Sequence, residues 1–234
     1  MQLFYASDID ANQNSYRFDK TESRHIVKVL RKLEGDRLNL TDGAGNHFDC
    51  IITQANDKRC IVAIEQVNPI EKDWDYYLHI AIAPTKLNDR LEWFLEKATE
   101  IGLDEITPIL CDHSERKTIK EERYEKILVS AMKQSLKFRL PKLNKLTKFS
   151  EFIKRPLPEN SYIAHCEDRE QQLLKNQSLK NEILIMIGPE GDFSSKEIDL
   201  ALNRAVKGIS LGKSRLRTET AALVACDTVS ILNQ

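Results

Sequence analysis

Beyond residue 76, short apolar runs alternate with segments of helical pattern, and this alternation restricts the fold more than any other feature of the chain. Tyr77–Ala83 and Ile183–Ile187 are almost continuously apolar and of strand length, as is typical of strands buried on both faces of a parallel sheet. Asp89–Ile101 lies between them, and its apolar residues recur at the spacing of one helix face. We therefore expect residues 76–234 to form an α/β domain with a mainly parallel sheet.

The remaining elements of this region follow from the same periodicities. Ser194 and Glu197 form the pattern of a capping box at the start of one helix. Gly208 stands where a C-terminal cap of that helix is expected. The other predicted strands are Glu105–Leu110, Tyr162–Cys166 and Ile209–Leu211, and the other predicted helices are Glu121–Phe138, Ser194–Ala205 and Thr218–Leu232.

Residues 1–70 have a different pattern, mostly β, which indicates a separate small barrel-like domain. A charged segment with a proline, Asn68–Asp75, is predicted to link the two parts. The predicted strands are Leu3–Ala6, Arg37–Thr41, Phe48–Thr53 and Cys60–Val67. One helix, Thr21–Leu33, is predicted from an apolar stripe formed by Ile26, Val29, Leu30 and Leu33.

Composition restricts the class of protein. With 41% hydrophobic and 30% charged residues, the chain has enough apolar material for a core, which excludes a disordered or collagen-like protein. No run approaches the roughly 18 apolar residues of a membrane helix, and the N-terminus has no signal-peptide pattern. The five cysteines are scattered and no Cys/His cluster is present, so we expect a cytoplasmic protein without disulfides or a metal site.

The formal net charge is only −1, but basic residues are concentrated locally. Met132–Lys148 contains six basic residues and Arg204–Arg217 contains five, with no acidic residue in either segment. Each segment is interpreted either as solvated surface or as a surface that contacts phosphate groups.

Two glycine-containing loops are the candidate functional segments. Residues 187–194 read IGPEGDFS and follow a predicted buried strand, and residues 211–220 read LGKSRLRTET and precede the last helix. Open α/β sheets bind ligands at the carboxyl ends of their strands, which is where both loops are expected. A phosphate loop is disfavoured because one residue is missing between Gly208 and Gly212-Lys213-Ser214, and no G-x-G-x-x-G sequence indicates a dinucleotide site.

Taken together, the two loops resemble the cofactor-binding end of the SPOUT methyltransferases, in particular the RsmE-type enzymes. The resemblance extends to Arg24-His25…Val29-Leu30-Arg31 near the N-terminus, to Glu96-Lys97-Ala98-Thr99-Glu100-Ile101-Gly102, and to Gln134-Ser135…Arg139-x-Pro141. It implies a knotted α/β domain, with the C-terminal chain in a trefoil knot, preceded by a PUA-like RNA-binding domain. The family often has Gly-Gly-Phe where this chain has Gly191-Asp192-Phe193.

The resemblance also implies an activity: S-adenosylmethionine-dependent methylation of uridine N3 in small-subunit (16S) ribosomal RNA by a homodimer. The substrate is either the RNA or the assembled small subunit. Arg217 is expected to stabilise negative charge on the uracil oxygens. Glu219 and Glu190 are candidates for orientation or proton acceptance, or alternatively for capping backbone N–H groups. The apolar helix at Thr218–Leu232 is expected either at the knot and the dimer interface or as an ordinary internal helix.

Two sets of binding residues follow from the resemblance. Those expected to bind S-adenosylmethionine are His165, Ile187, Gly188, Pro189, Glu190, Gly191, Leu211, Gly212, Ser214, Leu216, Arg217 and Thr220. Those expected to contact RNA are Arg24, His25, Lys28, Arg31, Lys86, Arg90, Gln134 and Arg139. The alternatives are a SPOUT ribose 2′-O-methyltransferase, or an RNA-binding assembly factor without catalytic activity.

Overall fold

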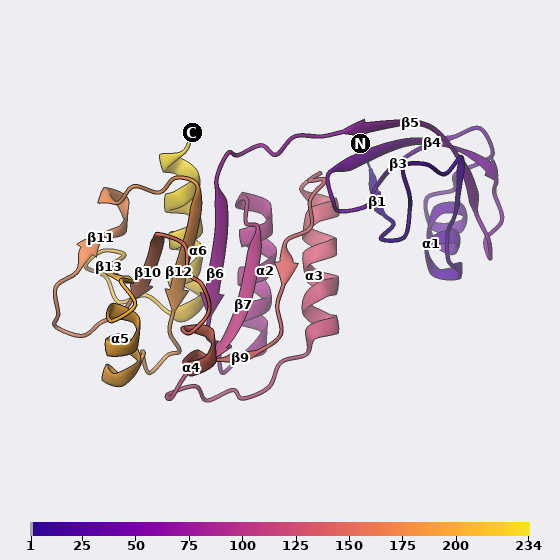
Figure 1. Cartoon of the computed structure of the whole chain (residues 1–234). Coiled ribbons are helices and arrows are strands. Elements are labelled where there is room, and N and C mark those ends of the chain that lie inside the picture. The colour runs from indigo at the N-terminus through magenta and orange to yellow at the C-terminus, as the bar shows by residue number, and fades with distance from the viewer. Residues whose placement is uncertain (1) are drawn as a thin grey trace. The chain divides into compact units, whose positions relative to one another are not determined.

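The computed structural model describes residues 2–234 and divides into two compact units (Figure 1). The first unit comprises residues 2–72 together with Met132–Leu140, and the second comprises Asp73–Ala131 and Pro141–Gln234. The sequence pattern alone assigns residues 132–140 to the second domain. In the structure this segment bonds to the first unit: Leu140 N–H donates to the carbonyl of Gly43 over 2.8 Å, and Gly45 N–H donates to that of Phe138 over 2.9 Å.

The first unit is built on a five-stranded sheet in the order β1-β3-β4-β5-β2. The strands are β1 (Leu3–Tyr5), β2 (Ser15–Arg17), β3 (Arg37–Thr41), β4 (Asn46–Gln54) and β5 (Ile61–Pro69). β1 pairs with β3 in parallel and the other pairs are antiparallel. Phe4, Phe48 and Ile52 belong to its buried core. The four predicted strands are confirmed, whereas the short β2 was missed.

The predicted helix at Thr21–Leu33 is wrong in its extent. An α-helix, α1 (Lys20–Arg24), continues as a π-helix, η1 (His25–Val29). The wider π turn changes which residues share a face. Ile26 is therefore fully buried, but Val29 and Leu33 are 67% and 69% exposed and do not form the predicted stripe.

The second unit contains an eight-stranded sheet in which β6, β12, β10 and β13 are the central strands and all described pairings are parallel. The strand order is β11-β13-β10-β12-β6-β7-β8, and β9 also pairs with β7. The strands are β6 (Tyr77–Ile82), β7 (Glu105–Leu110), β8 (Lys142–Leu143), β9 (Thr147–Lys148), β10 (Asn160–Ala164), β11 (Gln172–Leu173), β12 (Glu182–Ile187) and β13 (Lys207–Ser210). The expectation of a mainly parallel α/β sheet is confirmed.

Helices cover both faces of this sheet. α2 and α6 pack against each other, and α6 also packs on β6 and β12 (Figure 1). On the other face, Phe152 from α4 and Ile198 from α5 share a core cluster with Met186 of β12. The helices are α2 (Asn88–Ile101), α3 (Glu121–Gln134), α4 (Phe149–Phe152), α5 (Ser195–Leu202) and α6 (Thr218–Leu232), with a 3-10 turn η2 (Leu174–Asn176).

Of the two predictions made for the ends of α5, one is confirmed and the other is wrong. The capping box of Ser194 and Glu197 is present, so this prediction is confirmed. Gly208 is not the C-terminal cap, because it lies within β13 and the residue with positive φ after α5 is Ala205, at 60°. A Cβ at Gly208 would lie 3.0 Å from Nε2 of His165, so the glycine permits close packing of that ring.

A polar network lies at the edge of this sheet that is formed by β6, β7 and β8. His79 Nε2 is 2.7 Å from Thr107 Oγ1, and Asn144 Nδ2 donates to the same hydroxyl oxygen over 2.8 Å. The ring of His79 packs edge-on against Phe152, with 5.8 Å between ring centroids. Burial lowers the pKa of His79 to about 4.

We predict that His79→Gln makes the protein less sensitive to mild acid. The folded imidazole stays neutral down to about pH 4, whereas an unfolded histidine takes up a proton near pH 6.5, so the stability of the wild type decreases as pH falls through this range. Urea unfolding should show that the variant loses about 2 kcal/mol less than wild type between pH 7 and pH 5. Between pH 7 and pH 8 the two proteins should change almost equally. If both proteins lost the same free energy of unfolding between pH 7 and pH 5, His79 would not be the group that makes the wild type sensitive to acid.

Candidate functional site

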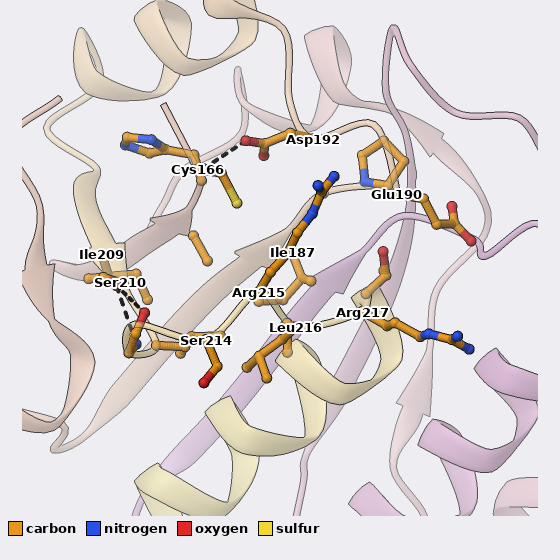
Figure 2. Close-up of a pocket in the computed structure, with 18 of the residues that line it drawn as sticks. Cys166, Ile187, Glu190, Asp192, Ile209, Ser210, Ser214, Arg215, Leu216 and Arg217 are labelled. Atoms are coloured by element: carbon orange, nitrogen blue, oxygen red, sulfur yellow. Dashed lines mark hydrogen bonds between the residues drawn. The ribbon is translucent and has the colours of Figure 1, made fainter. Parts of the chain in front are cut away.

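A cavity of about 970 Å³ opens at the carboxyl ends of β10, β12 and β13 (Figure 2). Every residue predicted to bind S-adenosylmethionine lines this cavity except Thr220. The two predicted loops also contribute Asp192, Lys213, Arg215 and Thr218. The lining residues outside both loops, which the sequence did not assign to this pocket, are Arg90, Ala164, Cys166, Gln171, Ile209, Ser210 and Ala221.

The loop after β12 turns sharply at Asp192, whose φ is 64°. Its carboxylate holds this conformation: Oδ2 accepts from Cys166 N–H over 2.7 Å and Oδ1 accepts from Phe193 N–H over 2.8 Å. A Cβ at Gly188 would lie 3.0 Å from the ring of Phe193 and 3.1 Å from its nitrogen. The glycine is therefore required by close packing beneath the cavity.

Glu197, which is 5% exposed, ties the same loop to the segment after β7. Its Oε1 accepts from Asp112 N–H over 3.0 Å, and Oε2 accepts from Ser194 N–H over 2.9 Å. His113 adds a further contact, because its Nδ1 lies 3.0 Å from the carbonyl oxygen of Gly191. A carbonyl oxygen only accepts, so Nδ1 of His113 carries the hydrogen.

The loop between β13 and α6 forms the opposite wall. Gly212 has φ of 128°, a conformation that L side chains rarely adopt. Arg215 and Arg217 are exposed, and Figure 2 shows their side chains pointing to different sides. Arg217 extends toward the end of the cavity where Glu190 lies, whereas Cys166 lies at the other end.

The Glu190 carboxylate accepts a hydrogen bond from a backbone N–H group. Capping of backbone N–H groups is one of the two roles predicted for it from the sequence. Its Oε1 accepts from Lys86 N–H over 2.9 Å. Arg116 holds the same segment, since its Nε donates to the carbonyl of Thr85 over 2.9 Å and its Nη2 to that of Lys86 over 2.7 Å. The sequence reasoning missed Arg116, because it lies 30 residues from Lys86 and belongs to neither loop.

Glu219 lies in the first turn of α6 and is not one of the residues that line the cavity. It is 7% exposed, its Oε1 is 3.8 Å from Nε of Arg90, and its Oε2 has no hydrogen-bond partner within residues 2–234. Thr220 does not line the cavity either, contrary to expectation. Thr218 and Ala221 of α6 do line it, because residues three apart share a helix face and the two between them point elsewhere.

His165 follows β10 and is 6% exposed. Its Nδ1 lies 2.8 Å from Nε2 of Gln171, and its own Nε2 has no hydrogen-bond partner in the described chain. Burial lowers the pKa of His165, so the ring is neutral near pH 7. His165 lines the cavity, but its Nε2 is buried and packs against Gly208, where a Cβ would lie 3.0 Å away.

The residues predicted to contact RNA are spread over both units. In the first unit Arg24, Lys28 and Arg31 are exposed, and Lys28 Nζ is 3.8 Å from Asp57 Oδ2. Arg31 has a φ of 55°.

The other five candidates differ in their surroundings. His25 is half-buried with its ring 6.2 Å from that of Phe4, and Gln134 is exposed at the end of α3. Arg139 donates from Nη1 to the carbonyl of Ala44 over 2.7 Å, which is a structural contact inside the first unit. In the second unit Lys86 is exposed, and Arg90 lines the cavity.

Within residues 2–234 no group of three or more His, Cys, Asp or Glu side chains is arranged to hold a metal ion. No helix in the same range has the length and apolar character needed to cross a membrane.

The fold and the site define a class: a parallel α/β domain with a cavity between two glycine-containing loops, joined to a β-rich unit. The RNA methyltransferase domain family matches residues 72–230, and the RNA methyltransferase PUA domain family matches residues 18–65. A protein of Rickettsia conorii named Ribosomal RNA small subunit methyltransferase E is 31% identical over 214 residues, which cover 89% of this chain and 86% of that protein.

Solved structures agree with these matches. A protein of Porphyromonas gingivalis described as a probable rRNA-methyltransferase has a TM-score of 0.93 and 44% identity, over 100% of this chain and 98% of that one. A methyltransferase structure from Legionella pneumophila, in complex with the bound cofactor SAM, has a TM-score of 0.87 and 25% identity, over 98% and 97%. The chain belongs to the RNA methyltransferase family that contains the Ribosomal RNA small subunit methyltransferases E.

We predict that Gly188→Ala destabilises the second unit. The added methyl group would meet the Phe193 ring, which is itself buried and packed 5.3 Å from the ring of Phe149, so neither ring has room to move. Denaturant unfolding should show a loss of about 1–3 kcal/mol. The double variant Gly188→Ala/Phe193→Leu should be less destabilised than the sum of the two single changes. If the destabilisation of the double variant equalled the sum of the two single changes, the contact with the Phe193 ring would not be the cause of the loss in Gly188→Ala.

Proposed function

We propose that this protein transfers a methyl group from S-adenosylmethionine to N3 of a uridine in small-subunit (16S) ribosomal RNA. The observation that supports this most is the cavity between the two loops, in a chain that belongs to an RNA methyltransferase family. The test is analysis of 16S RNA from a deletion strain, in which one N3-methyluridine should be missing. Loss of a ribose 2′-O-methyl group would favour the ribose methyltransferase, and no lost methyl group would favour a non-catalytic assembly factor.

The residues of the cavity suit S-adenosylmethionine. Its volume, about 970 Å³, is at the upper end of the range for small-molecule sites. Gly212 has no atom within 4 Å of where its Cβ would lie, so the backbone there is open to close approach by a ligand. When bound, S-adenosylmethionine supplies a methyl group on a positively charged sulfur.

Arg217 is our candidate for stabilising the transition state. Removal of the N3 proton leaves negative charge on the uracil oxygens, and a guanidinium directed at them would stabilise that charge. Arg217 is exposed and extends toward the end of the cavity where Glu190 lies. Glu190 uses one carboxylate oxygen for Lys86 N–H, which leaves the other for orientation or proton acceptance. Glu219, paired with Arg90, is placed to support the start of α6.

We propose that the β-rich unit binds RNA. Exposed Arg24, Lys28 and Arg31 are suited to phosphate contacts, which fix the position of a target without reading its sequence. The near-neutral net charge favours a shaped RNA–protein target over general RNA affinity. We also propose that residues 1–70 and 76–234 act as separate domains, apart from the segment 132–140.

Two further features are proposed from the family. The first is the trefoil knot in the C-terminal chain. The second is a homodimer formed through α6, whose exposed face includes Ile231 and Leu232.

We predict that Arg217→Lys lowers turnover by about a hundredfold or more, because lysine lacks the planar pair of donors. Binding of S-adenosylmethionine should stay within a few-fold of wild type. Single-turnover methylation of purified small subunits and cofactor titration measure the two effects. Arg204→Lys, outside the cavity, controls for the general effect of the exchange. Near-normal turnover would remove Arg217 from catalysis, and loss of folding would make it a structural residue.

We predict that Arg24→Ala and Arg31→Ala weaken RNA binding without changing cofactor affinity. Each lost phosphate contact should reduce the slope of log affinity against log salt by about one. Lys58→Ala, an exposed lysine of the same unit, serves as the control and should leave the slope unchanged. If both arginine variants kept the wild-type slope of log affinity against log salt, Arg24 and Arg31 would face solvent without contacting RNA.

A further inference from the structure

We infer that His113 is a positioning residue of the cofactor site, which holds the loop after β12 in the shape that binds S-adenosylmethionine. The inference rests on the proposed function, because it concerns how the cavity for that cofactor is formed. His113 is not one of the residues that line the cavity. It acts through Gly191 and Asp192, which do line it and whose carbonyl groups bond to its ring.

One ring nitrogen of His113 serves both carbonyl groups. Nδ1 lies 3.0 Å from the carbonyl oxygen of Gly191 and 3.1 Å from that of Asp192. Carbonyl oxygens only accept, so Nδ1 carries the hydrogen and shares it between them. The two residues are at a turn in which Asp192 N–H donates to the carbonyl of Pro189 over 2.9 Å. His113 therefore fixes the direction of two successive carbonyl groups at this turn.

The loop also packs directly on the base of the His113 side chain. A Cβ at Gly191 would lie 3.1 Å from Cβ of His113. A larger residue at this position would push the histidine away from the two carbonyl groups. The glycine of the loop and the histidine of the segment after β7 are therefore matched to each other.

The segment that carries His113 is held on both sides of it. Ser114 Oγ accepts from Cys111 N–H over 3.0 Å, and Asp112 N–H donates to Oε1 of Glu197 over 3.0 Å. Ser114 is buried, with 6% of its surface exposed. The Nδ1–H group is therefore presented to the loop from a fixed backbone.

The loss of this donor should affect cofactor affinity more than folding. His113 is exposed and belongs to no core cluster, so its removal leaves the packing of the sheet and helices intact. Without Nδ1–H, two carbonyl oxygens of the turn lose their donor and the loop gains freedom. The cofactor would then have to order the loop when it binds, which lowers affinity.

Two substitutions at this position test the inference by calorimetry with S-adenosylhomocysteine, the unreactive product. His113→Ala should bind it about five- to tenfold more weakly, as expected for one lost hydrogen bond. His113→Asn should bind within about twofold of wild type, because its amide nitrogen takes the place of Nδ1 and carries a hydrogen for each carbonyl. Thr118→Ala, an exposed residue after the same strand, is the control and should bind like wild type.

Two further readouts separate positioning from a purely structural role. With His113→Ala, the KM for S-adenosylmethionine should rise while turnover at saturating cofactor stays near wild type, and the free energy of unfolding without ligand should be almost unchanged. Long-range proton–nitrogen spectra of histidine-labelled protein at alkaline pH, with His113→Asn used for assignment, should show the hydrogen on Nδ1.

Unchanged affinity of His113→Ala, failure of His113→Asn to restore binding, or a hydrogen on Nε2 would overturn the inference alone. A lower free energy of unfolding with unchanged affinity would make His113 a structural residue. Failure of the wild type to bind S-adenosylhomocysteine would overturn the proposed function as well.

Discussion

Parallel pairing of β10 with both β12 and β13 is the constraint on which the site depends. Ile163 pairs with Met186 on one side and with Gly208 on the other, so the three strands run in the same direction and end at one edge. Helices pack on both faces of this sheet, and the central strands β10 and β12 are largely buried. The cavity therefore lies among the loops at the carboxyl edge, where the segments that follow β10, β12 and β13 meet.

Carboxylates give these loops a defined shape. Asp192, Glu197 and Glu190 each accept hydrogen bonds from backbone N–H groups of segments distant in sequence. Loops lack the regular backbone hydrogen bonds of helices and strands, and these bonds to carboxylates take their place. Each of them connects the loop after β12 to a different segment of the chain. A transfer reaction that depends mainly on positioning benefits from such rigidity, since the reacting groups meet without further ordering of the loop.

Elements with their own periodicity were predictable from the sequence, whereas those specified by distant partners were not. β6, β7, β12 and α6 were found because an apolar run or stripe marks them. β8, β9 and β11 have two residues each and exist only through pairing with neighbouring strands. In the site, the loop residues were found because glycines and charges mark them. Arg116 and His113 were missed because their roles depend on contacts that only the folded chain brings about.

Asp192 shows how a side chain stabilises a backbone conformation that usually requires glycine. A residue with φ of 64° strongly favours glycine, and a side chain there costs roughly 1–2 kcal/mol, less for aspartate than for most residues. The Asp192 carboxylate accepts from two backbone N–H groups, and a hydrogen bond to a charged group contributes about 1.5–3 kcal/mol. The second effect is at least as large as the first, so the strained residue is stable. One of those donors is Cys166 N–H, directly after His165. The Asp192 side chain therefore joins the loop after β12 to the segment that follows β10, and both segments line the cavity.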